Sequence, residues 1–442
     1  MKYVTAVCSA LIWGSGQFFN KQKLKALFFF IFEALFIFIE LITRGESHPE
    51  VAGSTFRDAG FFIKGIWGLV TLGSISRENS RVTVYDHSVM LMLAGIIAIM
   101  VLLIFVAIWI WNIRDAYKTR VAMESGVKYV SSVQYFQNLW NTAFEYIMIA
   151  PGLLLVIFIS IVPIFFAILV AFTNYNANFI PPRRLVEWTG LSTFVDIFKI
   201  KIWGGTFVQI LIWTVIWAFL ATFSSYIFGM FQALILRAKA VKLRTLWRAI
   251  FILPWAVPGL VSMLVFRTML HREGAINQLL LNAHIIDSAL PFLSDPILAK
   301  VCLVLVNVWL GFPYFMALIS GIMTTIPQEM YEAAQIDGAN IFQQFRSITL
   351  PFIIASTSPQ ILMSVTFNFN NFNMIYFLTG GGPPNPNFQM AGSTDILISW
   401  IFKLTLDQRM YNYASALSIF IFIILASVSA WNLLRTRSFK EG

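Results

Sequence analysis

The chain has 442 residues, of which 58% are hydrophobic and 12% are charged, and its mean hydropathy is +0.75. Soluble globular domains are about half apolar and about a quarter charged, so this composition excludes a soluble protein and indicates an integral membrane protein. The formal net charge of +10 does not point to a nucleic-acid partner, because membrane proteins hold Lys and Arg near their span ends on the cytoplasmic side.

The chain begins with a basic and apolar stretch, residues 1–23, which lacks a small-residue cleavage site and predicts a retained cytoplasmic segment. Runs of about 20 apolar residues follow, and this length crosses a hydrocarbon core about 30 Å thick. Such runs are expected to be helical, because backbone groups in lipid must be satisfied inside their own segment. The sequence predicts an all-α polytopic transmembrane bundle with eight spans, at about 24–44, 88–113, 147–172, 207–236, 247–270, 299–323, 349–378 and 411–434.

Two features near the first span depart from this simple pattern. Residues 59–75 form a shorter apolar stretch, interrupted by glycines and carrying Lys64, which favours an interfacial or re-entrant helix. Glu33 and Glu40 share one face of the first span, where a charge costs about 2.5–3.5 kcal/mol near the bilayer centre. We expect neighbouring helices to bury these carboxyl groups, or the boundary to bring them near water; a proton-coupled carrier is the competing interpretation.

The distribution of Lys and Arg predicts the orientation. With eight spans, most of the connecting segments that carry Lys and Arg fall on one side of the membrane, which places both termini in the cytoplasm. Arg183, Arg184, Lys199 and Lys201 oppose this assignment, but they lie in a loop of over 30 residues, where the rule weakens. The residues that favour it are Lys21, Lys23, Lys25, Arg114, Lys118, Arg120, Lys128, Arg237, Lys239, Lys242, Arg244, Arg248, Arg435, Arg437 and Lys440.

The sequence contains no recognisable metal or cofactor motif. Cys8 and Cys302 stand alone in apolar surroundings, and the four histidines show no metal-ligand spacing, so no metal site is predicted. No G-x-x-x-x-G-K-[ST] loop occurs, so the chain is not expected to bind ATP or another cofactor itself. The glycines at 380–382 lead into two prolines and predict a turn rather than a phosphate loop.

Residues 326–351 form a polar segment between two predicted spans, on the cytoplasmic side by the same parity. Pro327 suits the first turn of a helix, and Gly338 suits the left-handed position that ends one. Asn340 and Gln343 are spaced as a capping pair for a second short helix. The segment is therefore expected to form a compact helix–turn–helix knob, with an ordinary amphipathic loop as the alternative.

Two predicted spans carry polar and aromatic residues that share a face. Asn307, Gly311 and Tyr314 are spaced i, i+4 and i+7, and Asn368 and Asn371 are spaced i, i+3. An amide in lipid is costly unless paired, and it offers the donor and acceptor that a sugar hydroxyl needs, while aromatic rings suit the sugar's C–H surface. These faces predict either a wet carbohydrate cavity or hydrogen bonds between helices.

Pro254 and Pro258 interrupt the fifth predicted span. The carbonyl groups that they free need protein or water nearby. This span is therefore expected either to line or flex around a pathway, or to contain a tolerated kink.

The polar segment carries a recognisable signature. Glu332-Ala333-Ala334, Gly338, Ile348 and Leu350-Pro351 resemble the E-A-A-x-x-x-G-x(9)-I-x-L-P pattern of the membrane subunits of binding-protein-dependent ABC importers. In that family, the resemblance implies, the knob inserts into a cleft on a separate ATPase subunit, which binds the ATP. The residues implied in ATPase coupling are Glu332, Ala333, Ala334, Asp337, Gly338 and Arg346.

Longer stretches resemble one subfamily, the larger permease subunit of maltose/maltodextrin importers. They include VNVWLGFPYFMALISGI and TFNFNNFNMIYFLTGGGP. The resemblance implies the ABC type I importer permease fold, with alternating access around an α-1,4-glucan. The residues implied in substrate binding are Asn307, Leu310, Gly311, Tyr314, Ser364, Phe367, Asn368 and Asn371.

The resemblance also implies domains, partners and location. It implies an N-terminal membrane region at 1–140 and a permease core at 141–442, with the transmembrane type-1 domain at about 206–434 and the coupling loop at 326–351. The implied partners are a second permease subunit, two copies of a cytoplasmic ABC ATPase and an extracytoplasmic maltodextrin-binding protein, all at a bacterial plasma membrane. The gap at 173–206 is too short for the folded insert of enterobacterial relatives, which favours a cell without a periplasm and a lipid-anchored binding protein.

An ATP-driven importer of maltodextrin, or of another oligosaccharide, is the function that these features favour. An ion-coupled carrier would need internal repeats and intramembrane charge in the core, and the sequence shows neither clearly. A membrane enzyme such as a glycosyltransferase would need a set of carboxylates or a metal at the interface. Asp395 and Asp407 are expected to be isolated, so the enzyme interpretation is weak.

Overall fold

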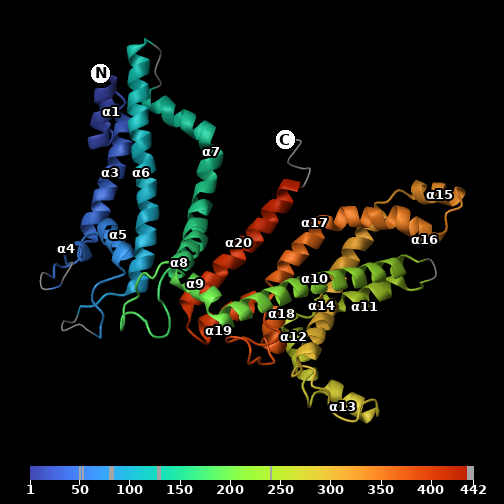
Figure 1. The fold of residues 1–442 in the computed structure, drawn as a ribbon. Helices are drawn as coiled ribbons and strands as arrows, with labels where there is room; N and C mark the ends of the chain where they lie inside the picture. The colour runs from blue at the N-terminus through green and yellow to red at the C-terminus, as the bar shows by residue number, and fades with distance from the viewer. Residues whose placement is uncertain (49–50, 52–53, 79–83, 127–130, 239–240, 436–442) are drawn as a thin grey trace. The chain divides into compact units, whose positions relative to one another are not determined.

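The computed structural model describes the chain except for residues 49–50, 52–53, 79–83, 127–130, 239–240 and 436–442. Lys128, Lys239, Arg437 and Lys440, which were used to predict the orientation, lie outside the described residues. Within the described part every regular element is a helix, and the only other pairings are two isolated β-bridges (Figure 1). The predicted all-α class is confirmed.

The first of two compact units comprises Met1–Thr193 and Met410–Ser415. Its helix α5 has 11 residues, too few to cross a bilayer, and packs along α6, as an interfacial or re-entrant helix would. The predicted lead-in at 1–23 forms α1 and α2, which also pack against α6. The elements are α1 (Lys2–Leu11), α2 (Ser15–Phe19), α3 (Lys23–Ile42), α4 (Ser54–Arg57), α5 (Phe61–Thr71), α6 (Ser88–Glu124), α7 (Ser132–Val156), the π-helical turn η1 (Ile157–Ile161) and α8 (Val162–Val170).

Buried polar side chains join α2 and α3 to α6. Lys25 Nζ lies 2.7 Å from Asp115 Oδ1, and the two side chains are only 3% and 11% exposed. Gln17 Nε2 donates to Asp115 Oδ2 at 3.2 Å and to the carbonyl oxygen of Asn112 at 2.8 Å. Lys25 therefore has a local counter-charge, in addition to the orienting role that the sequence assigns to it.

Glu33 and Glu40 accept hydrogen bonds from neighbouring segments. Glu33 Oε2 accepts from the backbone N–H of Trp13 at 3.1 Å, and Glu40 Oε2 accepts from that of Phe62 at 2.8 Å. Phe62 lies in the first turn of α5, where N–H groups have no acceptor within the helix. Both carboxyl groups are half-buried and hold adjacent segments in place, as the burial interpretation predicted.

The second unit comprises Phe194–Arg409 and Ala416–Gly442. Its centre is the long helix α10, which packs against α14 and α17 and buries Trp217 completely. Helix α13 lies at the opposite end of this unit from α15 and α16 (Figure 1). The remaining elements of the chain are α9 (Ser192–Lys199), α10 (Lys201–Arg237), α11 (Arg244–Ala256), α12 (Gly259–Met269), α13 (Ala275–Asn282), α14 (Pro296–Thr324), α15 (Gln328–Ile336), α16 (Ile341–Gln344), the π-helical turn η2 (Phe345–Thr349), α17 (Leu350–Phe369), α18 (Phe372–Thr379), α19 (Leu397–Leu406) and α20 (Tyr411–Arg435).

The helices account for most of the predicted spans. Helices α11 and α12 cover the fifth predicted span and meet at a bend of 88°, so this stretch is interrupted as predicted from Pro254 and Pro258, and it forms either a broken span or a re-entrant loop. The other two predicted spans are also helical, but α3 carries four charged residues and the described apolar part of α20 is short, Tyr411–Ser427. The count of eight and the cytoplasmic position of both ends stay predictions. The helical stretches long and apolar enough to cross a membrane are Ser88–Glu124, Ser132–Val170, Lys201–Arg237, Pro296–Thr324 and Ile341–Phe369.

The loop after α18 corrects one expectation and confirms another. Gly380 and Gly381 have φ of +61° and +76°, so the glycines form a turn as predicted. Asp395 is not isolated, because Lys403 Nζ lies 2.6 Å from its Oδ2 and Ser399 Oγ donates to its Oδ1 at 2.8 Å. A side chain at Gly381 would collide with Asp395, so the turn can pack on this buried pair only with glycine there.

The Lys25–Asp115 pair gives a test of the first unit. Asp115→Asn leaves Lys25 buried without its counter-charge, which costs about 3–5 kcal/mol when a buried pair is broken. We expect the apparent free energy of unfolding in detergent to fall by about that amount. The double variant Lys25→Met/Asp115→Leu removes both charges and should recover most of the loss.

The matched control is Glu124→Gln, which breaks the exposed pair between Arg120 and Glu124. This variant should change stability little, because exposed pairs contribute little. A double variant at positions 25 and 115 as unstable as Asp115→Asn would contradict the prediction.

Candidate functional site

A cavity of about 400 Å³ lies in the second unit, where the α11–α12 break meets α14 and the α17–α18 junction. It contains five of the eight predicted substrate-binding residues: Asn307, Leu310, Gly311, Phe367 and Asn371. The other three, Tyr314, Ser364 and Asn368, do not line it. The further lining residues are Pro254, Trp255, Val257, Pro258, Gly259, Met263, Asn373 and Met374.

Asn307 on α14 has both of the roles that the sequence left open: it lines the cavity, and it forms hydrogen bonds between helices. Its side chain is buried, and its amide nitrogen donates to the carbonyl oxygen of Ala221 at 3.0 Å and to Ser225 Oγ at 3.2 Å, both on α10. These bonds use both amide hydrogens to join the helices. The side-chain carbonyl oxygen of Asn307 is left to accept a hydrogen bond from a ligand in the cavity.

The two asparagines of the seventh predicted span do not share one helix face. The span is broken, because α17 ends at Phe369 and Asn371 is the N-cap of α18, where its Oδ1 accepts from the N–H of Met374 at 3.3 Å. Asn371 Nδ2 donates to Asn368 Oδ1 at 3.2 Å. Asn368 is buried behind it and donates to Thr222 Oγ1 at 3.0 Å. The i, i+3 interpretation was wrong, and Asn368 orients Asn371 from behind.

Aromatic rings border the cavity from two elements. Phe367 on α17 is well exposed, and Trp255 on α11 is half-exposed. The Tyr314 ring lies behind Trp255, with its centroid 6.0 Å from that of the indole. Sequence reasoning missed Trp255 and Gly259, although each directly follows one of the two prolines that predicted the break.

The bent pair of helices α11 and α12 borders the cavity directly. Pro254 lies inside α11, Pro258 is the N-cap of α12, and both line the cavity together with Val257. Unpaired carbonyl groups at such a break face polar space rather than lipid. The geometry therefore favours the lining interpretation over the tolerated kink.

The polar segment between α14 and α17 has the predicted helix–turn–helix form (Figure 1). Gly338 has φ of +79°, the left-handed conformation expected of the residue that follows a helix end. Its N–H donates to the carbonyl oxygen of Gln335 at 3.1 Å, and the N–H of Ala339 donates to that of Ala334 at 2.9 Å. This is the Schellman pair of bonds, and it fixes the turn at the end of α15.

The second half of the knob is fixed by its own cap and carries exposed apolar side chains. Asn340 and Gln343 form the predicted capping box, with reciprocal bonds of 2.9 and 2.8 Å. Ile336 and Ile341 are 87% and 86% exposed, and Phe342 is also exposed. Clustered apolar side chains this exposed are typical of interaction surfaces.

The predicted coupling residues lie on the same knob. All of them are exposed except Ala334, which is half-buried. Glu332 Oε1 accepts a hydrogen bond from Gln328 Nε2 at 3.0 Å, one turn earlier on α15. The set comprises Glu332, Ala333 and Ala334 on α15, Asp337 at its C-cap, Gly338 in the turn and Arg346 in η2.

Tyr331 connects α15 to the helices behind it. Its hydroxyl lies 2.8 Å from Thr349 Oγ1, at the end of η2. Arg237, at the end of α10, donates to that hydroxyl at 3.4 Å and holds its guanidinium carbon 5.0 Å from the ring centroid. Tyr331 therefore joins α15 to the end of α10 and to the end of η2, which precedes α17.

The bond between Asn368 and Thr222 can be tested for its structural role. Thr222→Val removes the acceptor of the Asn368 amide, and such interhelical bonds average about 0.6 kcal/mol with a maximum of about 1.7 kcal/mol. We expect a loss within that range in the free energy of unfolding. Thr366→Val, which removes an exposed hydroxyl bonded only within its own helix, is the control and should change stability little. Equal losses in the two variants would contradict the interhelical role.

Comparisons with known proteins agree with this geometry. The model of the family "Binding-protein-dependent transport system inner membrane component" matches residues 225–436. The galactooligosaccharides transport system permease protein GanP of Bacillus subtilis (strain 168) is 37% identical over 439 residues, covering 99% of this chain and 98% of GanP. The maltodextrin transport system permease protein MdxF of the same strain is 36% identical, covering 95% of this chain and 92% of MdxF.

A solved structure shares the fold. It is a bacterial alginate ABC transporter in complex with an alginate pentasaccharide-bound periplasmic protein, and one of its chains matches with a TM-score of 0.56. The match covers 69% of this chain and 98% of that chain at 19% identity, so it shows the fold of an ABC importer permease. The relatives are transport permeases and not enzymes. The chain belongs to the family of binding-protein-dependent transport system inner membrane components.

Proposed function

We propose that the chain is the membrane-spanning subunit of an ATP-binding-cassette importer and that its cavity carries an oligosaccharide toward the cytoplasm. The observation that carries this proposal is the cavity itself. It places the amide groups of Asn307 and Asn371 beside the exposed rings of Phe367 and Trp255. Amides suit sugar hydroxyl groups, and aromatic rings suit the C–H face of a pyranose.

The lining also indicates which class of sugar the cavity accepts. None of its lining residues, all in the described part of the chain, is charged. An uncharged lining offers no counter-charge for an acidic sugar or a coupling ion, and desolvating such a charge is costly. A neutral oligosaccharide is therefore the proposed cargo, and the ion-coupled carrier is not favoured.

We propose α-1,4-glucans of the maltodextrin type as the substrate. The support is the resemblance of eight positions to the sugar-contacting residues of maltose permeases, together with the similarity to MdxF. Galactooligosaccharides are the second candidate, because GanP is similar over nearly the whole of both chains. Both sugars are neutral and offer hydroxyl groups and C–H faces, so the same cavity chemistry serves either. They differ in linkage and in hydroxyl stereochemistry.

Coupling to ATP is proposed to run through the knob. Ile336, Ile341 and Phe342 would become buried in a cleft on a cytoplasmic ABC ATPase. The knob joins α14, which carries Asn307, to α17, which carries Phe367. Closure of the ATPase would therefore act on two helices that line the cavity, which is the requirement for alternating access.

The remaining partners complete the proposed assembly. A second permease subunit would supply the other half of the transport pathway, and two ATPase copies would dock on the two knobs. An extracytoplasmic binding protein would deliver the sugar, and a lipid-anchored one suits a chain whose 173–206 segment holds only α9, loops and the start of α10. A pull-down from membranes would test these partners directly.

The cavity is tested at Asn371. Asn371→Ser keeps an oxygen that can cap α18 but removes the amide of a lining residue, together with its bond to Asn368 Oδ1. In proteoliposomes with the complete importer, we expect uptake of labelled oligosaccharide to fall about tenfold while basal ATP hydrolysis is retained, because the change lies at the cavity and not on the knob. Asn282→Ala, at the exposed end of α13, is the control and should transport normally.

The same assay separates the two substrates. Saturable uptake of maltotriose, with little uptake of β-1,4-galactotriose, would support the maltodextrin assignment, and the reverse would replace it with the galactooligosaccharide one. Normal uptake of both sugars by Asn371→Ser would contradict the cavity assignment.

The knob is tested at Gly338. A side-chain carbon added there meets no atom within 4 Å, so the cost within this chain is the left-handed backbone, about 1–2 kcal/mol for Ala. We expect Gly338→Ala to lower the sugar transported per ATP hydrolysed, and Gly338→Asn to lower it less, because Asn tolerates this conformation better. Gly338→Asp adds a charge at the docking turn and is expected to uncouple the importer.

The control for this series is Gly321→Ala on α14, where space is equally open and the backbone is helical. It should leave coupling unchanged. Full coupling in Gly338→Asp would remove the support for docking at this turn.

A further inference from the structure

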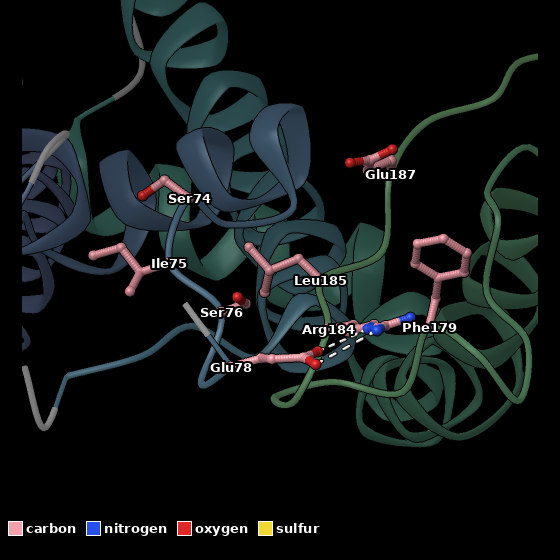
Figure 2. A pocket seen from close by; sticks show the side chains of 8 residues that line it. All are labelled: Ser74, Ile75, Ser76, Glu78, Phe179, Arg184, Leu185 and Glu187. Carbon is pink, nitrogen blue, oxygen red and sulfur yellow. Dashed lines mark hydrogen bonds and ion pairs between the residues drawn. The ribbon is translucent and has the colours of Figure 1, made fainter. Parts of the chain in front are cut away.

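A second and larger cavity, of about 650 Å³, lies in the first unit between residues 74–78 and 179–187 (Figure 2). Its lining includes Glu78, Arg184, Glu187 and the ring of Phe179. By the predicted orientation, both segments are on the extracytoplasmic side. The cavity is formed within the first unit alone, so it is separate from the cavity at Asn371.

Backbone and side-chain bonds hold the two segments together. The N–H of Arg77 donates to the carbonyl oxygen of Pro182 at 2.9 Å, and the N–H of Glu78 donates to that of Arg183 at 3.2 Å. Arg184 then donates to both carboxylate oxygens of Glu78, at 2.7 and 3.4 Å. The hydrogen bond from Arg184 lowers the pKa of Glu78, so both groups are ionised at neutral pH.

A buried ion pair fixes the start of the 74–78 segment. Asp86 Oδ1 accepts from Arg57 Nε at 2.7 Å, and both side chains are buried. Asp86 Oδ2 accepts from the N–H groups of Ser74 and Ile75 at 2.8 and 3.1 Å. The walls of the cavity are therefore set before any ligand arrives, which lowers the entropic cost of binding.

Two lining residues, Phe179 and Glu187, have bonded backbones, while their side chains make no ring stack or ion pair among the described residues. Phe179 is half-buried, its N–H donates to the carbonyl oxygen of Asn176 at 3.0 Å, and its ring stacks on no other ring in the described part. The N–H of Glu187 donates to Asn174 Oδ1 at 2.8 Å, whereas its carboxylate is exposed and pairs with no cation among the described residues. Figure 2 shows Glu187 and Phe179 on the same side of the view, apart from Ser74 and Ile75.

The chemistry of the lining selects the ligand. No cluster of three His, Cys, Asp or Glu residues occurs in the described part, and Arg184 would repel a metal cation. Glu78 and Glu187 would repel an anion, and the charged lining does not suit an apolar molecule. A neutral polyol satisfies all three conditions, because carboxylates accept hydroxyl protons, a guanidinium donates, and an aromatic ring covers a C–H face.

We propose that this cavity is a second carbohydrate site, in which a neutral oligosaccharide stacks on Phe179 and donates hydroxyl protons to Glu187. The volume lies in the range of about 300–1,000 Å³ that ligand pockets occupy. The ligand class follows from the lining of the first unit and does not depend on which sugar crosses the membrane.

The experiment measures sugar binding rather than transport. The full chain is studied with its partner subunits in nanodiscs, without binding protein, in an Asn371→Ser background that weakens the transport cavity. Maltotriose and β-1,4-galactotriose are titrated by saturation-transfer-difference NMR. We expect saturable binding in this background, weakened about fivefold to tenfold by Phe179→Ala and by Glu187→Gln, because each removes one contact.

Two variants control for chemistry and for charge. Phe179→Trp keeps an aromatic face and should bind at least as tightly as the background. Asp287→Asn removes an exposed carboxylate from the second unit and should leave binding unchanged. Glu187→Gln alters an exposed side chain, so it carries the test even where Phe179→Ala fails to fold.

Unchanged affinity in Glu187→Gln and Phe179→Ala, or no saturable binding in the background, would overturn the proposal. Uptake by the unmutated complete importer in proteoliposomes, with its binding protein, reports on the proposed function separately. An importer that moves neither sugar but still shows the Phe179-dependent binding would refute the transport assignment and keep the second site. Normal uptake without that binding would support the transport assignment and refute the second site.

Discussion

The constraint on which this structure depends is that backbone groups in a membrane need hydrogen-bond partners wherever a helix stops. The α17–α18 break frees N–H and carbonyl groups, and polar side chains satisfy them. Asn371 caps α18, and the carbonyl oxygen of Asn368 accepts from the buried indole of Trp217 at 3.1 Å. The break thus explains why amides stand at this depth, and the same amides give the cavity its polar character. Structural pairing and ligand recognition are two uses of one set of groups.

The same constraint organises segments outside the cavity. Glu40 satisfies the start of α5, and the Schellman bonds at Gly338 satisfy the end of α15. Asp86 satisfies the loop at Ser74 and Ile75, because it accepts hydrogen bonds from these two successive backbone N–H groups while it pairs with Arg57. In each case a side chain or a glycine replaces what a continuous helix would supply, and the chain gains a fixed turn at that point.

Features that depend on neighbouring residues could be predicted from the sequence, and features that depend on distant ones could not. The capping box at Asn340, the left-handed Gly338 and the break at Pro254 and Pro258 follow from local chemistry, so they were predicted. The break after Phe369 contains no proline or glycine, and the indole that bonds to the carbonyl oxygen beside it belongs to Trp217, which is 151 residues from Asn368. Likewise, Lys25 and Asp115 are 90 residues apart, and no local pattern joins them.

Because the knob lies between α14 and α17, coupling between the knob and the cavity acts in both directions. Equilibrium coupling between two sites is reciprocal: a partner that changes the cavity by docking must itself be bound more tightly or more loosely when the cavity is filled. Tyr331, which contacts both Arg237 and Thr349, joins the knob to α10 and to the end of η2. A nucleotide-driven subunit seated on this connection would register whether cargo is present before its own chemistry begins.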